Sequence, residues 1–326
     1  MGLATEPAVD LISDALQRVR LSGAVLFCVD LSAPWSLLTG GYPKLLPPAS
    51  HMTAFHVVLE GECWVGVNEE APHRLRAGDA VILPRAEVHS LSDQPGQASV
   101  LVADLLRDMP LPRLHKLRWG GSGPRTRMLC GFLGYEHAAF TPLYDSLPSL
   151  FCVRLGEGGS GPPLDALLRY AENEVVSRRP GLTGLRLRMA ELLFVEALRR
   201  HMAALPQDEA SWLAGVRDPL VGRAMAVLHE SPQRDWTVTQ LAQSVASSRS
   251  ALAARFHALL GEPPMHYLAR WRMLLAAGRL RDSRDSVESI AEAVGYRSSA
   301  AFQRAFKRRI GATPAQWRRD GEQSTG

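Results

Sequence analysis

The stretch "VGYRSSAAFQRAFKRRIGATPAQW", residues 294–317, combines a basic charge with an apolar rhythm of helical period. At about 100° per residue, one side of the helix would carry Ala301, Phe302, Ala305, Phe306 and Ile310. The other side would carry Ala300, Gln303, Arg304, Lys307 and Arg308. Between Ser298 and Ile310 there is no acidic residue, whereas a merely solvated helix usually mixes both signs. The pattern predicts a helix that packs by one face and meets a polyanion with the other.

The same spacing of landmark residues occurs twice in this part of the chain. Leu252, Phe256, Gly261, Pro264 and Tyr267 correspond to Phe302, Phe306, Gly311, Pro314 and Trp317 at a constant offset of 50. Upstream, Leu241, Ala242 and Val245 correspond to Ile290, Ala291 and Val294 at an offset of 49. Each unit predicts a short helix, a tight turn and a second helix, the helix-turn-helix pattern.

Capping residues mark where these helices should begin. Thr237 with Gln240 three residues later predicts a capping box, and Ser286 and Ser298 are expected N-caps. Gly295 is expected to supply the turn of the second unit.

This duplicated unit resembles the AraC/XylS class of bacterial transcription regulators over about residues 217–320. The resemblance implies a ligand-responsive regulator that binds double-stranded promoter DNA. Two recognition helices would enter successive major grooves, joined by a helix over residues 264–282. Carried over by position, the base-facing residues are Ser250, Ala253, Ala254, Ser299, Ala300, Gln303 and Arg304. Helix phase adds His257, Lys307 and Arg308, of which Lys307 and Arg308 suit phosphates. In the first unit small residues dominate, so that helix either approaches DNA closely or mainly positions its partner.

Charge is divided unevenly along the 326 residues. From Arg217 to Asp320 there are 17 Lys and Arg against nine Asp and Glu, a net +8, and the remainder has 20 against 24, a net −4. A chain of this length suggests two domains. The basic C-terminal third therefore has a polyanion as its expected partner.

Residues from about 20 to 155 predict strands. "GAVLFCVD", "AFHVVLEGECWVGV" and "DAVILP" are short, apolar and bounded by turn residues. "GDAVILPRAEVH", residues 78–89, fits G-x5-P-x4-H and resembles the second motif of cupin barrels. The expected fold is an N-terminal all-β, cupin-like barrel over residues 8–155 that serves as a sensor domain, followed by an all-α, double helix-turn-helix domain.

A small-molecule pocket is expected near Trp35, His56, Trp64 and His89, because aromatic and imidazole groups lie on short barrel strands. A zinc site built from His56, His89 and Cys130 is the open alternative. Metal-binding cupins supply an H-x-H pair and a glutamate that "HMTAFHVVLEGE" does not offer at that spacing. The competing function, a cupin-type metal enzyme with an appended helical domain, is therefore disfavoured. We expect a regulator without enzyme activity and without a required cofactor.

Residues 160–215 predict two long helices, which either pack on the β domain or form a dimer interface. The expected partners are promoter DNA, an unidentified small effector, a second copy of the chain and RNA polymerase. The N-terminal stretch lacks a basic region followed by an apolar core, and no apolar run of 18 residues occurs, which predicts a cytoplasmic protein without a membrane span. Four cysteines without a CxxC pair are expected to be small buried hydrophobes, with a redox-sensing pair as the alternative. Activation and repression are not distinguished.

Overall fold

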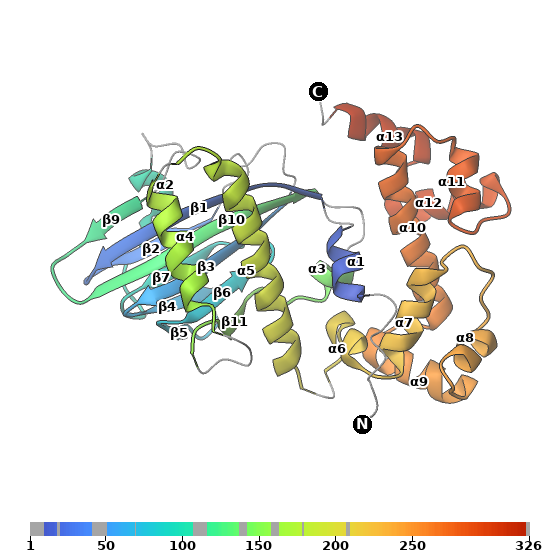
Figure 1. The fold of residues 1–326 in the computed structure, drawn as a ribbon, viewed down its shortest axis with the longest axis horizontal. Helices are drawn as coiled ribbons and strands as arrows, with labels where there is room; N and C mark the ends of the chain where they lie inside the picture. The colour runs from blue at the N-terminus through green and yellow to red at the C-terminus, as the bar shows by residue number, and fades with distance from the viewer. Residues whose placement is uncertain are drawn as a thin grey trace. The chain divides into compact units, whose positions relative to one another are not determined.

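The computed structural model describes residues 10–17, 20–40, 51–68, 70–106, 116–136, 142–157, 163–177, 179–206 and 209–323. The chain forms two compact units (Figure 1). One comprises Leu21–Glu136 and Leu147–Ala204, and the other comprises Met1–Arg20, His137–Ser146 and Leu205–Gly326. Within the predicted sensor range, residues 8–9, 18–19, 41–50, 69, 107–115 and 137–141 lie outside the described residues.

The first unit, called the β unit below, contains two sheets within its described residues. The six-stranded sheet has the order β11 (Phe151–Arg154), β6 (Asp79–Leu83), β3 (His51–Glu60), β10 (Arg125–Glu136), β1 (Arg20–Ser32) and β9 (Lys116–Gly120). The five-stranded sheet has the order β5 (His73–Arg76), β4 (Glu62–Val67), β7 (His89–Ser92), β2 (Ser36–Thr39) and β8 (Val100–Leu101). Strands β1 and β9 pair in parallel, as do β2 and β8. Strand β3 is antiparallel to both β10 and β6.

Alternate residues of both sheets form one apolar core. In β3, Ala54 and Val58 belong to this core, and Val65 and Leu91 reach it from the other sheet. Because strand side chains alternate between faces, His56 points to the same side of β3 as Ala54 and Val58. The fold confirms the predicted strand-rich, cupin-like domain.

Two helices, α4 (Asp165–Ser177) and α5 (Leu182–Ala204), lie in the β unit with the strands (Figure 1). Helix α5 packs against β10, β11 and β6 and buries one face, including Met189, Leu193, Phe194 and Leu198. The short helix α2 (Val102–Leu105) follows β8. Residues 160–215 are expected either to pack on the β domain or to form a dimer interface. Helix α5 packs on the β domain.

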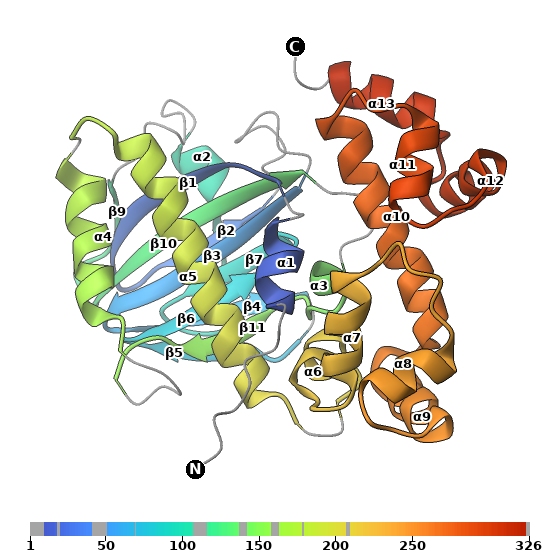
Figure 2. The same cartoon turned by 45° about the vertical axis from the view of Figure 1, so that its right-hand side comes forward.

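The second unit, called the helical unit below, contains the helix-turn-helix repeats. Its helices are α1 (Leu11–Gln17), α3 (Pro142–Asp145), α6 (Trp212–Arg217), α7 (Val221–Glu230), α8 (Val238–Ser244), α9 (Arg249–Leu260), α10 (Pro264–Asp282), α11 (Val287–Ala293), α12 (Ser299–Ile310) and α13 (Pro314–Gln323). Helix α10 runs between the pair α8–α9 and the pair α11–α12 (Figures 1 and 2). The predicted all-α, double helix-turn-helix region is confirmed.

The expected caps are present. Thr237 and Gln240 form the capping box of α8. The Ser286 hydroxyl accepts from the Ser289 N–H, and the Ser298 hydroxyl accepts from the Ala301 N–H. Gly295 has φ +86°, as its turn requires.

Candidate nucleic-acid interface and sensor cavity

The rotation of α12 is set by two phenylalanines. Phe302 and Phe306 are fully buried and pack against each other with ring centroids 5.6 Å apart. Trp317 of α13 approaches the Phe306 ring edge-on at 6.4 Å. With that face fixed, the exposed residues of the helix include Ala300, Gln303, Arg304, Lys307 and Arg308. The predicted amphipathic helix is confirmed; its contact with DNA stays a prediction.

The exposed side of α12 orders its polar groups along the helix. Ser299 is half-buried at the first position, and its hydroxyl accepts from Gln303 Nε2 at 3.3 Å. Gln303 and Arg304 can hydrogen-bond base edges, whereas Lys307 and Arg308 in the last turn suit phosphates. The arrangement can therefore both read bases and neutralise the backbone of a duplex.

Arg309 is exposed but differs from its basic neighbours. Burial raises the pKa of Glu262, and the cations Arg270 and Arg309 oppose that rise. The Arg309 charge is thus close enough to act on the turn between α9 and α10.

Helix α9 repeats the packing of α12 with fewer polar groups outside. Leu252, Phe256 and Leu259 are buried, while Ala253 is half-buried. The expected contact residues Ser250, Ala254 and His257 are exposed. The exposed Arg255 is held by Asp218, with Nε 2.9 Å from Oδ2.

Sequence reasoning missed Arg249, the first residue of α9. It is exposed and corresponds to Ser299 at the offset of 50. The N-terminus of a helix carries a partial positive charge, so a cation at that position is unfavourable. A nearby anion would offset this cost. The offset itself was the signal that could have found this residue.

Helix α10 sets the spacing of the repeats. Its 19 residues correspond to a length of about 28 Å. Both α9 and α12 pack against it. One turn of DNA rises about 34 Å, which is of the same order as the length of α10.

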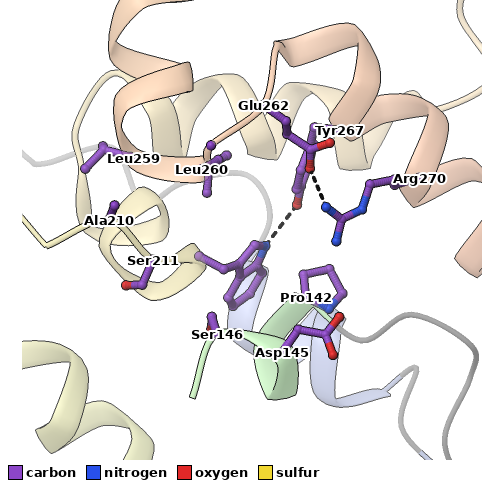
Figure 3. Close-up of a pocket in the computed structure, with 12 residues that line it drawn as sticks. Pro142, Asp145, Ser146, Ala210, Ser211, Leu259, Leu260, Glu262, Tyr267 and Arg270 are labelled. Atoms are coloured by element: carbon purple, nitrogen blue, oxygen red, sulfur yellow. Dashed lines mark hydrogen bonds and ion pairs between the residues drawn. The ribbon is translucent and has the colours of Figure 1, made fainter. Parts of the chain in front are cut away.

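A pocket of about 260 Å³ lies beside the first repeat (Figure 3). Its walls come from α3, α6, the end of α9 and α10. Trp212 Nε1 donates to the Tyr267 hydroxyl at 3.1 Å, and Arg270 Nη1 donates to Glu262 Oε1 at 2.9 Å. The carboxylate of Glu262 and the guanidinium of Arg270 are paired here, so the pocket favours neither an anionic nor a cationic ligand.

A chain of hydrogen bonds fixes α1 in the same unit. His229 Nδ1 is 2.8 Å from Asp14 Oδ2, and its Nε2 is 2.7 Å from the Tyr267 hydroxyl. The His229 ring also stacks on Trp271 with centroids 3.5 Å apart. Helix α1 is thereby joined to α7 and α10 of the first repeat.

The four expected pocket residues of the β unit do not form one cluster. His56 and His89 meet, with their Nε2 atoms 2.8 Å apart, and Trp35 is buried in the core. Trp64 is only half-buried, because its neighbours Cys63 and Val65 take the inward positions of β4. Arg74 instead lies 5.9 Å above the Trp64 ring. The structure therefore does not bring Trp64 together with the two histidines.

A void of about 30 Å³ lies inside the β unit, which we call the sensor cavity. His56 and Thr39 are the polar side chains among its described walls. The other walls are apolar: Phe27, Val29, Leu37, Leu91, Val102, Leu117, Met128, Cys130 and Phe132. Trp35 and His89 are not among the described walls.

The two histidines and Cys130 do not fit a zinc ion. Two nitrogens that share a tetrahedral zinc at 2.0–2.1 Å are about 3.3 Å apart, and these nitrogens are closer and hydrogen-bonded. Within the described ranges, no three His, Cys, Asp or Glu side chains are grouped to hold a metal. The sequence alternative of a site at His56, His89 and Cys130 is thus not supported.

The cysteines are free thiols. Burial raises the pKa of Cys28 and of Cys63 to about 12, and that of Cys130 well above its usual range. A reactive thiol needs a lowered pKa, so these three behave as buried hydrophobes. Among the described residues, no helix is both long and apolar enough to cross a membrane.

Comparison with protein families matches both parts of the chain. Residues 10–203 match a family described as Cupin, and residues 241–320 match one described as Helix-turn-helix domain. The cupin match includes α4 and α5, the helices that lie with the strands in the β unit.

Named relatives match most of the length of this chain. A putative AraC-like transcription regulator of Streptomyces lividans is 33% identical, with 87% of this chain and 92% of the relative covered. The HTH-type transcriptional regulator AlkR of Acinetobacter baylyi is 28% identical over 95% of this chain and 99% of its own. The DNA-binding domain of AdpA, solved with a target DNA, is 33% identical over 32% of this chain and 92% of that one, with a TM-score of 0.30. The chain therefore belongs to the AraC family of DNA-binding transcription regulators and carries a cupin-like N-terminal domain.

Proposed function

We propose that α12 reads the bases of a promoter operator through Gln303 and Arg304, while Lys307 and Arg308 hold its phosphates. The observation that carries this proposal is the full burial of Phe302 and Phe306, which turns those four side chains outward. A guanidinium can bond guanine O6 and N7 together, which is the commonest specific contact in the major groove.

In the first repeat, α9 offers Ser250, Ala253, Ala254 and His257 to DNA, and Arg249 adds a cation at its start. Small side chains permit a close approach of the backbone and contact with thymine methyl groups. We therefore assign α9 a weaker base preference than α12.

The β unit is proposed to bind a small effector in the sensor cavity, and the protein to act as a regulator rather than an enzyme. The relatives named as transcription regulators support this choice over a cupin-type metal enzyme. The division into a sensor (8–155), a helical connector (160–215) and a DNA-binding domain (217–320) stays a prediction.

Assembly and location also belong to the proposal. Tyr170 and Val176 on α4 and Leu192 on α5 are about half exposed, which supports a homodimer through these helices. Contact with RNA polymerase and a cytoplasmic location follow from the regulator role.

Arg304→Ala tests the base-reading role. We expect a loss of affinity of about ten- to a hundredfold on a preferred site selected from random DNA, with little loss on scrambled DNA. Binding of the full-length variant to both duplexes measures the ratio. The matched control Arg309→Ala should leave that ratio unchanged, because the helical phase of Arg309 places it on the apolar side, away from Arg304. Equal losses for Arg304→Ala on both duplexes would reassign it to a phosphate.

A further inference from the structure

The contact between His56 and His89 crosses from one sheet of the β unit to the other. His56 lies on β3 and His89 begins β7, and both side chains are at most 3% exposed. Their rings are 5.0 Å apart between centroids, at 56° to each other. Because the rings meet through Nε2 of each, the position of one proton decides the position of the other.

The Glu87 carbonyl determines which ring nitrogens of the two histidines carry protons. It lies 2.7 Å from His89 Nδ1 and can only accept, so His89 Nδ1 carries a proton. Burial lowers the pKa of His89 to about 4, and burial together with His89 lowers that of His56 well below its usual value. Both rings are thus neutral at pH 7 and hold one N–H each. His89 Nε2 must then accept, and His56 Nε2 must donate to it.

This arrangement of protons leaves His56 Nδ1 unprotonated, with its lone pair available to accept a hydrogen bond. The atom is buried and has no hydrogen-bond partner in the described part of the chain. His56 is also a wall of the sensor cavity, whose other described walls are apolar except for Thr39. A buried acceptor without a donor is unfavourable, so an occupant that donates a hydrogen bond would be favoured there.

We propose that the sensor cavity binds a neutral, apolar molecule that carries one hydroxyl or N–H donor, and that His56 Nδ1 accepts this donor. No charged side chain is among the described walls, so an ionised ligand would lose its hydration without compensation. The inference rests on the proposed effector role of the β unit and specifies the chemistry of that effector.

The cavity constrains the size of the occupant. Its 30 Å³ has room for about two water molecules, enough for the donor group and its nearest atoms. A larger ligand must displace a wall. Met128 is the wall best suited to move, because its side chain is unbranched and flexible.

The first test is the protonation of His56 in the full-length wild-type chain. Nitrogen-15 NMR of the imidazoles distinguishes a protonated ring nitrogen from a bare one. We expect Nδ1 bare and Nε2 protonated in His56, with the reverse in His89. A protonated His56 Nδ1 would overturn the proposal, and this result does not depend on any ligand or on DNA.

The second test uses phenol and toluene, which have nearly the same shape and differ in the hydroxyl. Binding to full-length Met128→Ala, whose cavity is enlarged, is compared with binding to Met128→Ala/His56→Leu. We expect the phenol-to-toluene affinity ratio to fall about three- to tenfold when His56 is lost. Taking this ratio cancels the different hydration of the two probes. Leu91→Val in the Met128→Ala chain alters an apolar wall and should leave the ratio unchanged.

Equal losses of phenol and toluene, or no binding of either probe to the enlarged cavity, would overturn the proposal. The effect of phenol on operator affinity is measured separately in Met128→Ala. Phenol binding with the expected ratio but without any change in operator affinity would uphold the cavity chemistry and remove the effector role.

Discussion

At the scale of single residues, Phe302 and Phe306 decide what α12 presents to its surroundings. Both are fully buried, so the helix cannot rotate without exposing an aromatic ring. Their spacing was readable in the sequence because a helix repeats every 3.6 residues. The exposure of Arg304 and Lys307 was therefore predictable, whereas their contacts with bases and phosphates stay predictions.

The contact between His56 and His89 could be predicted only in part from the sequence. His56 and His89 lie 33 positions apart on strands of different sheets, and no local pattern reports such a meeting. The outward direction of Trp64 did have a signal, since Cys63, Val65 and Val67 form an alternating apolar set. Only one set of alternate residues in β4 can face the core. Cys63, Val65 and Val67 occupy those positions, so the Trp64 ring faces the other side of the strand.

Acid should weaken the β unit through these histidines. In the folded protein the pKa of His89 is about 4 and that of His56 is also lowered, so both rings stay neutral as the pH drops below 6.5. In the unfolded chain both histidines have the ordinary pKa of 6.5 and bind protons below that pH. The free energy of unfolding should therefore be fully present above pH 6.5 and fall as the pH drops from there toward 4, by up to about 1.4 kcal/mol per pH unit for each histidine.

Urea unfolding between about pH 7 and about pH 5 measures this dependence. His56→Leu should reduce its slope, and the exposed His257→Ala should not. A slope that is the same in the wild type and in His56→Leu would show that His56 does not remain neutral in the fold.

At the scale of elements, the two helix-turn-helix units differ in the turn. Ala246 has φ +53°, in the left-handed region, where the second unit has Gly295 at φ +86°. A Cβ at Gly295 would lie 2.6 Å from the Gln233 carbonyl oxygen and 2.9 Å from the Arg272 guanidinium. The first turn therefore carries backbone strain that the second avoids.

Exchanging these turn residues should change stability in opposite directions. Ala246→Gly should raise the free energy of unfolding by up to about 1 kcal/mol, and Gly295→Ala should lower it by about 1–2 kcal/mol or more. Urea unfolding of both full-length variants measures the change. Destabilisation by Ala246→Gly would mean that the loss of Ala246 contacts outweighs the relieved strain.

The helical elements were more predictable than the sheets. Caps at Thr237, Ser286 and Ser298 and the apolar period are local, so they appear in a single sequence. The parallel pairing of β1 with β9 joins residues almost 90 positions apart, such as Cys28 with Lys116. Such pairing depends on packing across the whole core, and the strand pattern alone does not specify it.

At the scale of the whole molecule, charge and spacing define the DNA-binding surface. The region from Arg217 to Asp320 carries a net +8, and α10, about 28 Å long, packs against both α9 and α12. The composition predicted the polyanionic partner. The sequence cannot show which basic residues are already paired, as Arg255 is with Asp218.

Salt should weaken DNA binding strongly, because each cation at a phosphate releases condensed counterions. Lys307→Ala and Arg308→Ala should each weaken binding on all sequences and lower the salt slope by about one unit. Titrations at several salt concentrations measure the slope. Arg74→Ala is the matched control, since Arg74 pairs with Glu62 in the β unit. An unchanged slope in both α12 variants would remove these residues from the interface.

The most direct test of the account is selection of bound sequences from random DNA, performed with the wild type, Arg304→Ala and Arg249→Ala. The wild type should select two specified stretches about one helical turn apart. Arg304→Ala should relax the base preference in one stretch, and Arg249→Ala should affect only the other. A consensus that Arg304→Ala leaves intact, or a single stretch that both variants alter, would contradict the assignment of α9 and α12 as two separate recognition helices.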